Sequence, residues 1–155
     1  MYLGGCESLK EITISETVTS IGNECFSYCY SLVSLTLSPN LTSLGSLAFE
    51  SSGFPTIVLP NSLNEILGYT LSFCKNLKAV TLPDKITHIR AGAFQECYSL
   101  PSIKLPSTVK FIGEKVFFHC EQTLLKSIFR MAFCRIKTKT FEQMFVSEIY
   151  PYLHL

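Results

Sequence analysis

The sequence predicts a repeat solenoid, a stack of flattened coils joined by a parallel β-sheet of about five rungs. Three observations support this fold class. An apolar pattern recurs about every 23 residues. Each unit contains a short alternating apolar segment of the kind that forms a strand. A serine or a proline follows that segment in each complete unit.

The period is set by an apolar residue that opens each unit. Successive openers are 23, 23, 22, 23 and 23 residues apart, and they are Leu3, Phe26, Phe49, Leu71, Phe94 and Phe117. The short step falls at Gly53–Pro60, where one residue is lost before the strand. The stretch from Phe94 to Val116 is a complete unit, and most of the chain before it consists of copies of it.

Each unit has one segment that is expected to be a strand. In the fifth unit, Ile103 and Leu105 lie on one face of an extended chain and Lys104 on the other. Pro106 has no N–H for a ladder, so it ends the strand and turns the chain. A single coil cannot bury both of its open sides. Stacked coils bury one another, with equivalent strands about 4.8 Å apart.

Two further elements are expected in each unit. The opener and the cysteine three residues later, as in Phe94–Cys97, predict a short helical turn. A second apolar column predicts a weaker strand of two to three residues. This column is Ile21, Leu44, Ile66, Ile89 and Ile112. Glycine recurs directly after it at Gly22, Gly45 and Gly113, which we interpret as a turn that needs a permissive backbone.

These columns resemble a known family. The pattern F-x-x-C-x-x-L-x-x-I-x-L-P-x-x-V-x-x-I-G-x-x-A is similar to the BspA-like leucine-rich repeats, the treponemal-type 23-residue class of bacterial and protist surface proteins. The similarity covers about residues 1–120. It implies a right-handed leucine-rich-repeat solenoid that binds proteins, often in adhesion at a cell surface. It implies no enzymatic activity and supplies no catalytic residues.

Residues 121–155 form a separate, non-repeat tail. Residues 121–149 contain no Gly or Pro, and their apolar residues have helical spacing, which predicts a helical pair that caps the last coil. A mispredicted segment of the gene is one alternative. A basic amphipathic helix on a membrane surface is another, although we do not expect membrane contact. The basic residues of that alternative are Lys126, Arg130, Arg135, Lys137 and Lys139.

Composition argues against two classes of protein. Apolar residues make up 47% of the chain and the mean hydropathy is +0.30, but no run of about 18 apolar residues exists, so a membrane-spanning helix is not expected. The net charge of +1, from 13 basic and 12 acidic residues, gives no electrostatic attraction to nucleic acid. The N-terminus lacks the features of a secretory signal and starts just ahead of a repeat unit, so we expect a fragment of a longer array.

No catalytic site, metal site or cofactor is expected. The three histidines are scattered, and His88 falls at an outward repeat position, which favours a solvated surface role. Phosphate loops and nucleophile motifs are absent from the sequence. Five of the seven cysteines share one column, which favours buried free thiols over a disulfide or metal set. They are Cys6, Cys29, Cys74, Cys97 and Cys120.

The candidate functional surface is the outward face of the predicted sheet, which we expect to contact a protein partner. Its residues, called here the contact strip, are Lys10, Thr13, Thr36, Val58, Lys78, Thr81 and Lys104. Asn40-Leu41-Thr42 is a glycosylation sequon, so Asn40 is a candidate modification site. The edge of the first strand, Leu9–Ile14, is open to pairing with a second copy.

Two functional hypotheses follow. The first is a non-catalytic protein-binding and adhesion module of a cell-surface protein, which the family resemblance favours. The second is an intracellular, cytoplasmic protein–protein interaction scaffold built on the same repeats, which the free thiols and the missing signal favour.

A stability test checks the assignment of inward and outward columns. Replacing Phe94 or Ile103 with Ala is expected to reduce the free energy of unfolding by about 2–5 kcal/mol, because each leaves a cavity. Thr81→Ala, on the outward face, is expected to cost little. Denaturant titrations measure the three values, and equal losses would show that the columns are assigned wrongly.

Overall fold

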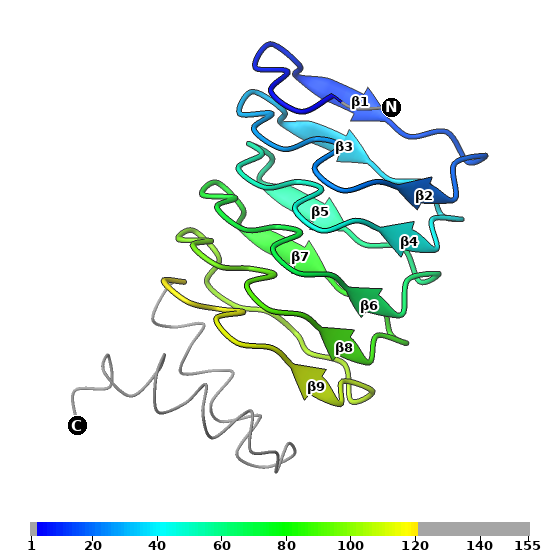
Figure 1. Cartoon of the computed structure of the whole chain (residues 1–155), viewed down its shortest axis with the longest axis vertical. Coiled ribbons are helices and arrows are strands. Elements are labelled where there is room, and N and C mark those ends of the chain that lie inside the picture. Colours follow the sequence, from blue (N-terminus) through cyan, green and yellow to red (C-terminus); the bar gives the residue numbers. More distant parts are fainter. Residues whose placement is uncertain (1–2, 121–155) are drawn as a thin grey trace.

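The computed structural model describes residues 3–120, which form a stack of flattened coils (Figure 1). Within this range the regular secondary structure consists of nine short strands, without a helix. The strands are β1 (Glu11–Thr13), β2 (Ser20–Ile21), β3 (Ser34–Thr36), β4 (Ser43–Leu44), β5 (Thr56–Val58), β6 (Glu65–Ile66), β7 (Ala79–Thr81), β8 (His88–Ile89) and β9 (Phe111–Ile112). The predicted solenoid is confirmed. The tail predicted for residues 121–155 lies outside the described residues.

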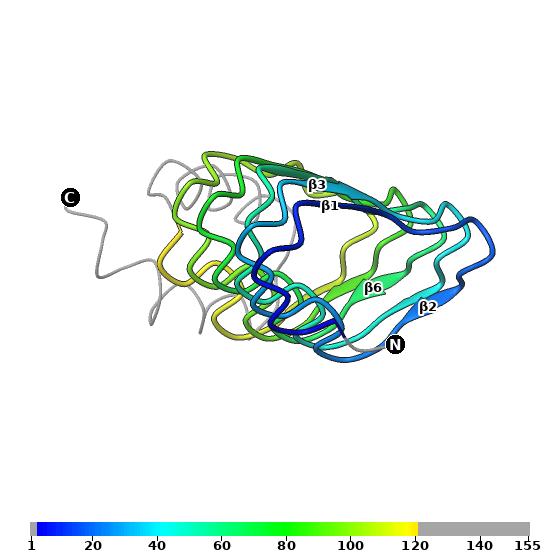
Figure 2. The ribbon, with the colours of Figure 1, turned by 90° about the horizontal axis from the view of Figure 1, so that it is seen from above.

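Each coil carries strands on two sides. Seen along the stack, β1 and β3 lie on one side of the coil, and β2 and β6 lie on the other (Figure 2). The first side holds the main strands β1, β3, β5 and β7. The second side holds the weaker strands β2, β4, β6, β8 and β9. The second, weaker strand predicted for each unit is therefore confirmed.

Strands on the first side pair in parallel with a register of one repeat. Ile12 lies beside Leu35, and Ile57 lies beside Val80. The continuous sheet of about five rungs is wrong, however. The ladder joins β1 to β3 and β5 to β7, but it does not join β3 to β5. In the fifth unit, residues 100–105, where the main strand is expected, form no strand.

Proline explains both interruptions. In the column before each strand, the N–H of Val33 donates to the carbonyl of Lys10 at 2.8 Å, and the N–H of Lys78 donates to that of Pro55 at 2.7 Å. The third and fifth units have Pro55 and Pro101 in this column. Proline has no N–H to donate to the preceding coil. The hydrogen-bond ladder of the first side is therefore interrupted before the third unit and before the fifth.

The segment after each opener is not a helical turn, which corrects the prediction. In each coil from the second onward two residues, such as Gly92 and Glu96, have φ values near +60°. A right-handed helix excludes such values. This segment instead bonds to the next coil. The N–H groups of Tyr69, Leu71 and Phe73 donate to the carbonyls of Ala91, Ala93 and Gln95 at 2.9, 2.9 and 2.7 Å. We call this series of bonds the turn ladder.

The core is built from stacked columns between the two sides. Phe26 stacks on Phe49 with ring centroids 5.5 Å apart, and Phe94 stacks on Phe117 at 5.7 Å. All four rings are at least 97% buried. The shortened third unit adds Phe54, whose ring meets Phe49 edge-on at 5.7 Å. In the first coil the equivalent apolar residues are only partly buried.

Glycine after the second strand allows coils to approach closely. A Cβ at Gly113 would lie 2.5 Å from the backbone nitrogen of Ala91, and one at Gly45 would lie 2.4 Å from that of Asn23. Neither residue has a positive φ. The interpretation of Gly45 and Gly113 as conformationally permissive turn residues is therefore wrong, since the role of these two glycines is steric.

A matched pair of substitutions tests this role. Gly113→Ala is expected to lower the free energy of unfolding by about 1–3 kcal/mol, because the methyl group meets fixed backbone. Gly22→Ala occupies the same column, but its Cβ meets no described atom within 4 Å. It should leave the urea midpoint nearly unchanged. A similar loss in both variants would contradict the steric explanation.

Candidate functional site

The structure places every residue of the contact strip on the solvent-exposed surface. The register brings Thr13 beside Thr36 and Val58 beside Thr81. Lys10 and Lys78 directly precede β1 and β7. Lys104 lies in the fifth unit, where the strand is missing. The strip is therefore a shared face with two breaks, and its role in binding stays a prediction.

A groove opens within the strip where the ladder between β3 and β5 is missing. Its volume is about 350 Å³, which is at the lower end of the range of ligand pockets. We call it the β3–β5 groove. Its lining residues are Leu35, Thr36, Leu37, Pro39, Thr56, Val58 and Pro60. The sequence analysis missed this groove, although the proline and the lost residue before β5 mark its position.

The strip has an unusually apolar centre for a solvent-facing surface. Val58 is 66% exposed and Val33 is 58% exposed. Val58 is a strip residue that lines the groove, whereas Val33 flanks the strip directly before β3 and does not line the groove. Because clusters of exposed apolar side chains beside polar residues are typical of contact surfaces, the centre of the strip is its strongest candidate for binding.

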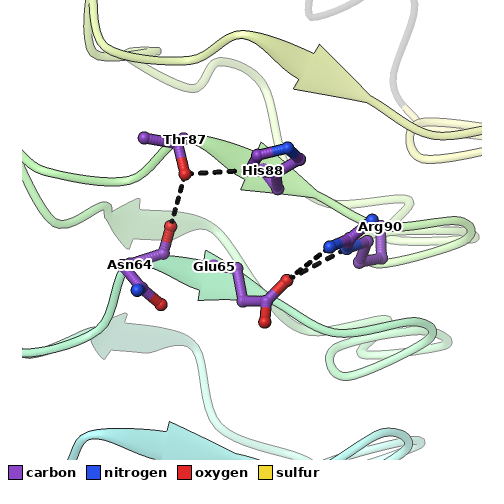
Figure 3. Close-up of polar contacts among 5 residues, drawn as sticks. All are labelled: Asn64, Glu65, Thr87, His88 and Arg90. Carbon is purple, nitrogen blue, oxygen red and sulfur yellow. Dashed lines mark hydrogen bonds and ion pairs between the residues drawn. The ribbon is translucent and has the colours of Figure 1, made fainter.

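The second side carries a polar cluster on β6 and β8 (Figure 3). Arg90 donates from Nε and Nη2 to Oε2 of Glu65 at 3.0 and 2.9 Å. Thr87 Oγ1 donates to the carbonyl of Asn64 at 3.2 Å and lies 2.9 Å from Nδ1 of His88.

This cluster has a structural explanation. His88 is half-buried rather than fully solvated as expected, and its ring lies 5.8 Å from that of Phe111 on β9. The Arg90 guanidinium lies 5.8 Å from the same ring. The Arg90–Glu65 pair is largely solvent-exposed, with side-chain exposures of 46% and 37%. Exposed pairs contribute at most about 1 kcal/mol, so the cluster links neighbouring coils only weakly.

Exposed tyrosines lie at the turn edge of the coils. Tyr98 is 47% exposed and donates from its hydroxyl to Glu96. This hydrogen bond raises the pKa of Tyr98. The Lys75 ammonium lies 5.9 Å from the centre of the Tyr98 ring. The Lys75–Tyr98 contact joins consecutive coils at the surface, whereas the Tyr98–Glu96 hydrogen bond lies within one coil.

Four of the five cysteines in the column are buried in the core, as predicted, and Cys6 in the first coil is only partly buried. Cys29, Cys74 and Cys97 are fully buried, and they are free thiols. Their thiols also donate hydrogen bonds, which the sequence analysis missed. Cys74 Sγ donates to the carbonyl of Phe49 at 3.1 Å, and Cys97 Sγ donates to that of Leu71 at 3.2 Å.

The one serine in this column supports the donor role. Ser52 stands where the other units have cysteine, and its Oγ donates to the carbonyl of Phe26 at 2.8 Å. Each of these side chains reaches the opener of the preceding coil. The column therefore requires a small side chain with a donor, which both Cys and Ser supply.

The sequon residue Asn40 is exposed, but its amide takes part in a contact between coils. Its Nδ2 donates to the carbonyl of Glu16 at 3.0 Å. Glycosylation at Asn40 would replace one of the two hydrogens of this Nδ2, and it stays a prediction.

Comparison with known proteins agrees with this architecture. The sequence model of the BspA type leucine rich repeat region matches residues 2–124 in six copies. The chain belongs to this family. It therefore shares the leucine-rich repeats that generally mediate protein interactions. No curated protein matches the chain.

Three solved structures are similar to this BspA-type protein. The T. pallidum leucine-rich repeat protein has a TM-score of 0.65 at 24% identity, covering 88% of this chain and 74% of its own. The pneumococcal vaccine antigen PcpA has a TM-score of 0.64 at 27% identity, and the match covers 72% of this chain and 28% of PcpA. A leucine-rich repeat protein from Bacteroides ovatus has a TM-score of 0.62 at 24% identity, covering 75% and 42%.

This BspA-type chain thus spans less than half the length of two of these proteins. The described residues, 3–120, contain no helix that is long and apolar enough to cross a bilayer.

The buried thiols predict a pH dependence of stability. Burial raises the pKa of Cys74 from 9.0 to about 12. Between these values the folded state keeps a proton that the unfolded state releases. The free energy of unfolding should therefore fall as the pH rises, by about 1.4 kcal/mol per pH unit for this thiol.

Urea titrations between about pH 8 and about pH 11 measure this slope. Cys74→Ser keeps a small donor but removes the thiol, so its slope should be shallower. Equal slopes in the two proteins would contradict the assignment.

Proposed function

We propose that this chain is a non-catalytic protein-binding module of a cell-surface BspA-type protein, that it acts in adhesion, and that it binds through the contact strip. The observation that carries the proposal is the exposed, apolar centre of the strip, on a repeat scaffold whose other apolar columns are buried. Val33 and Val58 keep more than half of their surface in water. Exposure of apolar surface to water is unfavourable, and burial against a partner would remove this unfavourable free energy.

The composition of the strip supports a protein as the partner. Protein interfaces combine an apolar centre with a polar rim. Here the centre is formed by the second and third units, and the rim includes Lys10, Lys78 and Lys104 of the first, fourth and fifth units. The small hydroxyl side chains of Thr13, Thr36 and Thr81 lose little side-chain entropy when they are covered. The strip therefore resembles an interface in its composition.

A position at the cell surface is part of the same proposal. PcpA, which is 27% identical over the shared region, is described as a pneumococcal vaccine antigen. That description concerns PcpA. It supports a surface location here because the two chains share the fold over the aligned region.

An intracellular scaffold is the second candidate function. The observation that favours it is the set of free, buried thiols, including Cys29, Cys74 and Cys97. Disulfides are common in extracellular proteins and rare in the cytosol. The binding surface would be the same strip, so the two candidates differ in location rather than in mechanism.

A crosslinking experiment in the source cells tests the binding surface. A photo-crosslinking residue at Thr81, on the strip, should give discrete adducts with partner protein. The same residue at Ser43, which is exposed on β4 of the second side, serves as the matched control. Adducts of equal yield at the two positions, or none at Thr81, would contradict binding through the strip.

Protease treatment of intact cells tests location independently. The tagged protein should be cleaved from outside if it lies at the surface. Full protection on intact cells, with cleavage after lysis, would instead support the intracellular scaffold.

A further inference from the structure

The β3–β5 groove is formed by the second and third coils. The coils on either side of them, the first and the fourth, carry charges at matching positions. The second and third units contribute residues 33–39 and 55–61, and none of these residues is charged. The first unit has Lys10 before its strand and Glu16 six residues later. The fourth unit has Lys78 before its strand and Asp84 six residues later. All four side chains are exposed.

These charges give the two ends of the groove opposite signs. At the end where the strands start, Lys10 and Lys78 outnumber Glu11. At the end where the strands finish, Glu16 and Asp84 outnumber Lys85. An occupant aligned with the strands would therefore meet positive charge at one end and negative charge at the other.

The groove lies between β3 and β5, which are not joined by a ladder in the described structure. It is lined by residues of both strands and by Pro39 and Pro60 beyond them, so an occupant aligned with the strands is an extended segment. The apolar walls, formed by Leu35, Leu37, Val58 and Pro60, suit an aliphatic side chain.

We infer that the β3–β5 groove binds an extended segment of the partner protein that has aliphatic residues at its centre. Acidic residues of the segment lie near Lys10 and Lys78, and basic residues lie near Glu16 and Asp84. This inference rests on the proposed function, since it assigns the anchor point and the partner chemistry of the contact strip.

The probe for the test is a displayed library of random linear peptides, selected on the full 155-residue chain. The expected product is an enriched consensus with an acidic end, an aliphatic centre and a basic end. A synthetic peptide of that consensus is then measured by calorimetry. A second peptide, with its acidic and basic ends exchanged, should bind at least roughly tenfold more weakly, because both ends would meet like charges.

Substitutions in both walls locate the peptide. Val58→Lys and Thr36→Lys place a long charged side chain in the groove from β5 and from β3, and each should weaken binding at least roughly tenfold. Thr13→Lys puts the same side chain on the strip outside the groove lining and should bind normally. The substituted residues are all exposed, so urea midpoints should match those of the unchanged protein.

Failure of the groove and failure of the proposed function give different results. The groove assignment is overturned if no consensus is enriched, or if the selected peptide binds Val58→Lys and Thr36→Lys as well as it binds the unchanged chain. The strip as a whole still stands in that case if Thr81 gives its crosslinks in cells. If Thr81 gives no crosslinks, binding through the strip is contradicted together with the groove.

Discussion

The structure depends on one constraint, which is that a flat coil leaves backbone groups and apolar side chains open on both of its sides. Only another coil of the same shape, in the same register, can pair with all of them. The turn ladder repeats at each interface between described coils for this reason, and strand ladders and phenylalanine stacks recur at several of them. A residue that disturbs one coil therefore weakens the interface with the neighbouring coil rather than contacts within the coil itself.

The repeat period, the buried columns and both strand positions could be predicted from sequence, because each leaves a periodic apolar signal. The turn segment could not. Its opener and cysteine are three residues apart, as in a helical turn, and nothing in the residue types indicates the left-handed φ of Glu96. The steric role of Gly113 was missed for a related reason, since it depends on the distance to Ala91 in another coil.

The exposed strip was predicted from alternation along the strands, but its groove was not. In the sequence, Pro55 and the lost residue are variations in one repeat among several. In the structure they remove a donor from the ladder and separate β3 from β5. The candidate site thus arises at the unit that departs most from the repeat. Departures of this kind cost stability at one interface, and they give an otherwise uniform surface a single distinct position.

The turn ladder also gives the stack a direction. Its N–H groups all point toward the coil that follows, as in the bonds from Tyr69, Leu71 and Phe73, and its carbonyls point toward the coil that precedes. The backbone bonds of the second side run the other way, since the N–H groups of Gly45 and Arg90 donate to the carbonyls of Ile21 and Ile66 in the preceding coil. A coil inserted the wrong way round would set acceptor against acceptor on one side and donor against donor on the other. Duplication or loss of whole units in evolution preserves the ladder, whereas inversion of a unit would break it.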